Sequence, residues 1–144
     1  MPQRGACPYA PAMRAFGLAP SAAEIEALAR GALARLPAPF ADHLGDIVLQ
    51  VEEFADDDTL KEMGIDDPFE LTGLYEGIPL TERSVEHSGT LPDRVRLFRR
   101  PILDEWADGG DTLEHLVTHV LVHEIGHHFG LSDDDMHALE DAAR

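Results

Sequence analysis

The sequence predicts a single globular domain in which amphipathic helices are combined with a few short strands. The chain has 144 residues, which is within the usual size of one domain. Hydrophobic residues make up 44% and charged residues 27%, the balance of an ordinary soluble protein with one core. Segments with helical spacing of apolar residues occur beside segments that are β-branched or alternate between apolar and polar residues.

The charge and cysteine content restrict the partners and the compartment. The net charge is −17, and a surface of that sign repels phosphate, so we expect neither nucleic acid nor a membrane as partner. Cations or basic peptides fit this charge better. The single cysteine, Cys7, cannot form an intramolecular disulfide, and no apolar run approaches the roughly 18 residues that span a bilayer. We therefore expect a cytoplasmic protein and favour a monomer.

The first half of the chain predicts an arm, a helix and a strand. Proline-rich residues 1–20 are expected to form a flexible N-terminal arm, with one domain over 21–144. Ser21 and Glu24 form a capping box for a helix that Pro37 ends. Residues 46–52 predict a mostly buried strand, and residues 59–63 predict helical turns closed by Gly64.

Two further strands are predicted in the middle of the chain. Residues 71–78 contain two glycines and precede a proline, which is typical of an edge strand. Such an edge could receive an extended peptide by strand addition. Residues 93–100 alternate, with Arg94 and Arg96 expected on a solvated face and anion recognition as the alternative.

The C-terminal third predicts two helices separated by a sharp turn. The pattern is helical from Asp111, the expected N-cap, to Phe129, and Gly130 is expected to take a positive φ and end the helix. Ser132 then begins a short terminal helix, in which Met136 is expected to pack in the core.

Residues 123–127 read His-Glu-Ile-Gly-His, an HExxH sequence inside the longer predicted helix. A spacing of four residues advances a helix by about 6 Å and a little over one turn. Both imidazoles, of His123 and His127, therefore leave the same face and can converge on one ion.

A catalytic zinc needs a third protein ligand, with one position left for water. Gly130 can reverse the chain, and Asp133 lies just beyond it, so we predict Asp133 as the third ligand. Ser132 or Asp134 could lie next to the metal instead, or Asp133 could only cap the last helix.

Other histidines extend the same helix. His119 and His123 form a rival pair at the same spacing, but His119 has no acid directly after it, so a structural, surface or supporting role is favoured. His128 points about 100° away from His127 and is not expected to be a ligand.

Three segments carry a resemblance to a known family: GLYEGIPLTER at 73–83, LFRRPIL at 97–103 and, most specifically, VHEIGHHFGLSDDDM at 122–136. Over roughly residues 21–140 the chain resembles the small bacterial zincin-like metallopeptidases, sometimes called minimal zincins. The resemblance implies an α+β minimal zincin-like fold, with a small mixed sheet, a backing helix, and an active-site helix followed by a short C-terminal helix. It also implies that His123, His127 and Asp133 match the metal-binding motif and Glu124 the catalytic acid.

The predicted activity is hydrolysis of a peptide or protein substrate with Zn²⁺ as cofactor and Glu124 as general base. Tyr75 could donate to an oxyanion, although packing is the favoured role for its side chain. Two alternatives remain: a metal-binding protein with vestigial or no peptidase activity that acts as an interaction module, and another metal-assisted hydrolase.

Overall fold

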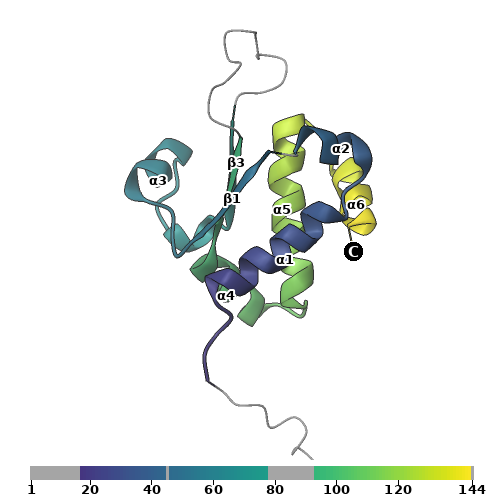
Figure 1. Cartoon of the computed structure of the whole chain (residues 1–144). Coiled ribbons are helices and arrows are strands. Elements are labelled where there is room, and N and C mark those ends of the chain that lie inside the picture. Colours follow the sequence, from purple (N-terminus) through teal and green to yellow (C-terminus); the bar gives the residue numbers. More distant parts are fainter. Residues whose placement is uncertain (1–16, 45, 78–92, 144) are drawn as a thin grey trace, which may run out of the picture.

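The computed structural model describes residues 17–44, 46–77 and 93–143 (Figure 1). Within them, helices and strands follow one another in the order α1 (Ala22–Ala34), α2 (Ala38–His43), β1 (Val48–Glu52), α3 (Asp57–Met63), a short 3-10 turn (Pro68–Glu70), β2 (Gly73–Glu76), β3 (Arg94–Phe98), α4 (Arg99–Asp108), α5 (Leu113–Phe129) and α6 (Asp133–Ala142). The predicted α+β fold class is confirmed. The predicted arm of residues 1–20 lies outside the described residues except for its last four.

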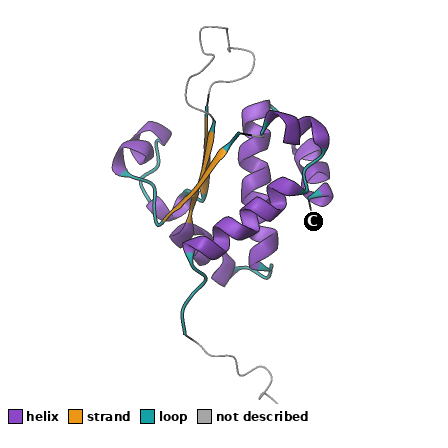
Figure 2. Ribbon diagram, in the orientation of Figure 1, coloured by secondary structure: helices purple, strands orange, loops and turns teal. Residues whose placement is uncertain are grey.

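The three strands form one small mixed sheet in the order β1-β3-β2. Figure 2 shows the strands beside the larger group of helices. β1 is parallel to β3, with Leu49 opposite Val95, and β2 is antiparallel to β3, with Tyr75 opposite Val95. The prediction that the glycine-containing segment is an edge strand is confirmed, because β2 pairs only with β3 within the described sheet.

The main core lies between the sheet and the helices α1, α5 and α6, on one side of the strands (Figure 1). α1 begins as predicted: the Ser21 side chain accepts a hydrogen bond from the Glu24 N–H, and the Glu24 carboxylate accepts one from the Ser21 N–H. Its buried residues, Ile25, Ala29 and Ala32, recur at helical spacing and face α5 and β1.

The opposite face of the sheet is covered at Arg96, which corrects the prediction for this residue, while the Arg94 side chain stays 41% exposed beside Glu76. The chain between β1 and β2, including α3, folds over this face and forms a second small core with Phe98. Arg96 is 6% exposed and donates hydrogen bonds to Glu52 at 2.9 Å and to Asp56 at 3.0 Å. Burial lowers the pKa of Arg96, but these hydrogen bonds outweigh burial and raise it overall. The guanidinium is therefore a structural ion pair rather than an anion site.

Two other expectations need correction, one at the end of β3 and one at the start of α5. The segment predicted as a strand through residue 100 ends at Phe98, and Arg99 begins α4, a helix that the sequence pattern did not reveal. Pro101 fits in the first turn of α4, where no intrahelical donor is needed. The N-cap of α5 is Thr112 rather than Asp111, because the Thr112 side chain accepts from the His115 N–H at 3.1 Å.

Candidate active site

The HExxH motif lies in the C-terminal half of α5, where the helix packs against the edge strand β2. His123, Glu124 and His127 line one pocket, and the ring centroids of the two histidines are 5.8 Å apart with nearly perpendicular planes. Spacing on the helix accounts for this arrangement, because residues three and four apart share one face. The pocket also contains Thr72, Glu105, His119 and Val120.

The turn after α5 has the predicted geometry. Gly130 has a φ of 69°, and the Leu131 N–H donates to the Gly126 carbonyl at 2.8 Å, so the chain reverses at the end of the helix. Ser132 caps α6 by accepting from the Asp135 N–H. Asp133 is thus the first residue of α6 and not its cap. It is exposed.

Close packing of α6 on α5 depends on Gly126 inside the motif. A Cβ atom at this position would lie 2.4 Å from the Met136 sulfur, so a larger residue cannot fit without movement. Met136 is 3% exposed, which confirms its predicted place in the core. This contact sets the distance between the helix that carries the histidines and the first turn that carries Asp133.

The surroundings of His123 lower its pKa and so favour the neutral imidazole, the form that binds a metal. Burial lowers its pKa most, His119 and His127 lower it further, and Glu140 and Asp133 oppose them. The His119 ring lies 4.2 Å from the His123 ring, centroid to centroid, and its Nδ1 is 3.1 Å from the Glu140 carboxylate. His119 is therefore a neighbour of the site, held from α6.

Glu124 packs against β2. A Cβ atom on Gly73 would lie 3.3 Å from Glu124 Cγ and 2.9 Å from Val120 Cγ1, so glycine allows the close approach of strand and helix. Burial raises the pKa of Glu124, against smaller lowering effects of His127 and of a hydrogen bond from the Tyr75 N–H.

The proposed metal ligands have the right chemistry, but their side chains are not closed around one point. In the described ranges, no group of three or more His, Cys, Asp or Glu side chains is placed to hold a metal ion. His127 and Asp133 are both exposed, so packing does not fix their rotamers. Two imidazoles and a carboxylate form a donor set that suits zinc, and the lowered pKa of His123 favours the neutral imidazole that zinc needs. The donors fit, and the assignment of these ligands stays a prediction.

His128 and Tyr75 lie outside this pocket. The His128 side chain is 7% exposed, and its ring stacks on that of Tyr75 with the centroids 3.9 Å apart. The Tyr75 hydroxyl donates to Asp93 at 2.7 Å, so its side chain has the packing role favoured by the sequence rather than facing a substrate.

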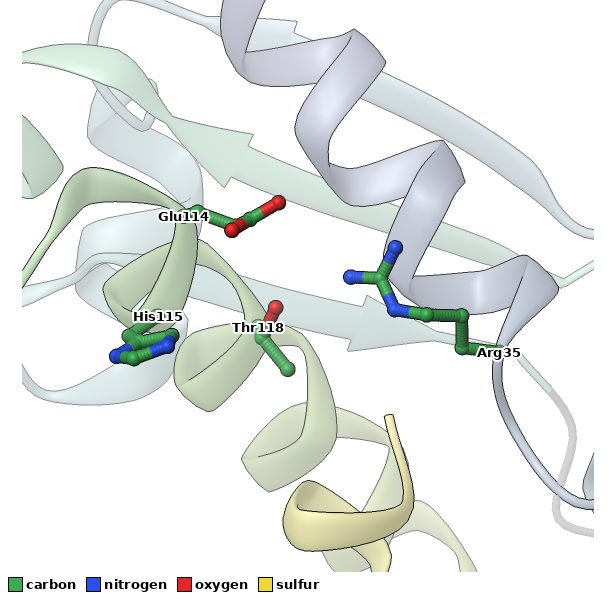
Figure 3. Close-up of a pocket in the computed structure, with 4 residues that line it drawn as sticks. All are labelled: Arg35, Glu114, His115 and Thr118. Atoms are coloured by element: carbon green, nitrogen blue, oxygen red, sulfur yellow. The ribbon is translucent and has the colours of Figure 1, made fainter. Parts of the chain in front are cut away.

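Thr72 and Glu105 are pocket residues that the sequence did not reveal. Glu105 lies on the unpredicted helix α4, and Thr72 precedes β2, so neither carried a local signal. A second pocket, lined by Arg35, Glu114, His115 and Thr118, lies at the other end of α5 and contains no residue of the motif (Figure 3). Arg35 Nε donates there to the Ala143 carbonyl and joins the end of α1 to the end of α6.

An α+β domain that presents His, Glu and His on one helix beside a sheet edge has the features of a zincin-type metallopeptidase. A comparison with protein families supports this class: residues 44–143 match the zincin-like metallopeptidases, and the chain belongs to that family. A search of curated proteins gives no match. None of the helices in the described residues is long and apolar enough to cross a membrane.

Proposed function

We propose that the protein is a zinc-dependent peptidase, with His123, His127 and Asp133 as metal ligands and Glu124 as general base. The observation that carries the proposal is that His123, Glu124 and His127 share one pocket at the edge strand β2. Family membership supports a metallopeptidase of this class.

Zinc at this site would supply a Lewis acid that polarises the scissile carbonyl and makes the attacking water more acidic. Glu124 would take the proton from that water and later give it to the leaving amine. Burial raises the pKa of Glu124, and a carboxylate with a raised pKa is a stronger base towards the attacking water.

The outer edge of β2 offers main-chain groups to an extended substrate. The Phe98 N–H donates to the Thr72 carbonyl at 2.9 Å. Because hydrogen-bonded pairs alternate in an antiparallel ladder, the main-chain groups of Gly73 point away from β3 and can pair with a substrate. A peptide that adds as a further strand at Gly73 would lie along the pocket that contains Glu124.

Glu124→Gln tests the function, with Glu114→Gln on the same helix as the matched control. Zinc content and cleavage of a peptide library are measured for both variants and the unmodified protein. We expect Glu124→Gln to keep its zinc and lose cleavage by about a hundredfold or more, because a general base contributes about 10²–10⁴-fold. Glu114→Gln is expected to keep both.

A zinc-loaded, unmodified protein that cleaves no peptide would contradict the peptidase and favour a metal-binding interaction module. Equal cleavage by Glu124→Gln and the unmodified protein would contradict the role of Glu124 alone.

A further inference from the structure

Three side chains form a largely buried cluster beside the pocket: Tyr75 in β2, Asp93 just before β3, and His128 near the end of α5. The Tyr75 hydroxyl donates to Asp93 Oδ2 at 2.7 Å, and His128 Nε2 lies 3.7 Å from the same oxygen. The side chains of Asp93 and His128 are 12% and 7% exposed. A carboxylate and an imidazole are thus largely removed from water, next to the phenol of the half-buried Tyr75.

Tyr75 also contacts Glu124 through its main chain. Its N–H points to the outer edge of β2, on the side where Glu124 packs against the strand at Gly73, and it helps to lower the pKa of Glu124. The Tyr75 ring stacks on His128. Glu124 and His128 are four residues apart and lie one above the other on the same face of α5. One residue of the edge strand therefore contacts two successive turns of the active-site helix, one through its amide and the other through its ring.

Glycines make this close approach possible at both ends of β2. A Cβ atom on Gly77 would lie 2.3 Å from Asp93 Oδ1, and one on Gly73 would lie 2.9 Å from Val120 Cγ1. Burying ionisable groups adds little net stability compared with apolar side chains of the same volume. Directional hydrogen bonds instead fix the relative position of the groups that they join.

We propose that Tyr75, Asp93 and His128 are positioning residues that hold β2 on α5 and so fix the carboxylate of Glu124. The inference rests on the proposed peptidase function, in which Glu124 moves the proton. Asp93 fixes the ring of Tyr75, the ring fixes the strand, and the Tyr75 N–H fixes the carboxylate. Loss of the hydroxyl or of the Asp93 charge loosens the strand and misplaces the general base without touching the metal ligands.

Tyr75→Phe and Asp93→Asn test this proposal, because both keep the backbone N–H and the stacked ring. The matched control is Asp111→Asn, which changes the exposed Asp111–His115 pair, 3.1 Å apart, at the N-terminal end of α5 and far from Glu124 in the sequence. We expect kcat for a cleaved peptide to fall about tenfold with KM and zinc content unchanged, since a displacement of about 1 Å can reduce the rate a hundredfold.

A second measurement does not depend on the catalytic activity of the protein. Hydrogen exchange of the Tyr75 amide, followed by NMR in zinc-free protein, reports whether the N–H is still bonded to Glu124. We expect exchange to become about tenfold faster in Tyr75→Phe and Asp93→Asn, to remain unchanged in Asp111→Asn, and to be fastest in Glu124→Ala, which removes the acceptor.

Unchanged exchange in both cluster variants would overturn the proposal, as would faster exchange with unchanged kcat. If the unmodified protein cleaves no peptide, the peptidase function fails, while the exchange rates still decide whether the cluster holds Tyr75 on Glu124. His128→Phe, which keeps a stacked ring but removes the imidazole, provides a third variant, and an exchange rate equal to that of the unmodified protein would contradict the part assigned to His128.

Discussion

Replacing Gly126 by alanine tests whether the close packing of α6 on α5 is needed to build the site. The new Cβ atom would lie 2.4 Å from the Met136 sulfur and 2.5 Å from Met136 Cγ, whereas optimal non-bonded contacts are about 3.5–4.0 Å. Met136 is 3% exposed and has little room to move away. We therefore expect α6 to shift and to carry Asp133 with it.

The size of the effect follows from two opposing terms. Overpacking of a core costs about 1–3 kcal/mol, and alanine in a helix gains about 1 kcal/mol over glycine. A contact this short places the cost near the upper end, so unfolding free energy should fall by about 2 kcal/mol. For a chain of this length that is a drop in Tm of roughly 4–8 °C.

Thermal and urea denaturation of Gly126→Ala measure this loss, and Gly110→Ala is the matched control because a Cβ atom there meets nothing within 4 Å. Zinc affinity should fall together with stability. In the background of Met136→Ala, which removes the obstructing atoms, Gly126→Ala should cost little or become stabilising. An equal cost in both backgrounds, or an unchanged Tm in the single variant, would refute the reasoning.

Further predictions concern the ion pairs under α3 and the pocket. Hydrogen bonds from Thr59 and Arg96 hold the pKa of Asp56 at about 2, below 3.8, so its stabilising effect is full above pH 3.8 and is lost as the pH falls through about 2. Urea midpoints of Asp56→Asn should therefore lie below those of the unmodified protein at pH 7 and converge with them near pH 2. Arg96→Met should lower the unfolding free energy by about 2 kcal/mol, less than for a fully buried pair because the carboxylates left behind are partly exposed, and an unchanged urea midpoint would contradict this. Glu105→Lys should raise KM about threefold to fivefold for peptides with a lysine beside the scissile bond but not for neutral peptides, since an exposed charge pair is worth up to about 1 kcal/mol.

Local signals account for the parts of the fold that the sequence predicted well. The capping box at Ser21, the turn at Gly130 and the cap at Ser132 are each made by residues within three or four positions of one another. Such features are set by the chain itself, so they could be read in order along it. The HExxH spacing belongs to this group, because it depends only on the pitch of α5.

Expectations were wrong where residues distant in sequence decide the environment. The alternation in β3 correctly indicated that Val95 and Leu97 face the opposite way from Arg96. It did not indicate that the segment containing α3 packs over the face of the sheet that carries Arg96. Arg96 is buried because Glu52 and Asp56, more than 30 residues earlier, come to meet it. The pocket residue Glu105 was missed for the same reason, since only tertiary packing brings α4 to the motif.

Anomalous diffraction at the zinc edge, from crystals grown with zinc, tests the central claim most directly. We predict one zinc ion per chain at full occupancy, bound by His123, His127 and Asp133, with Glu124 beside it but not coordinated. The same measurement on Asp133→Ala should show a weakened or absent peak, and on Asp134→Ala an unchanged one. No zinc peak between α5 and α6, or a full peak that persists in Asp133→Ala, would contradict the metal centre proposed for this protein.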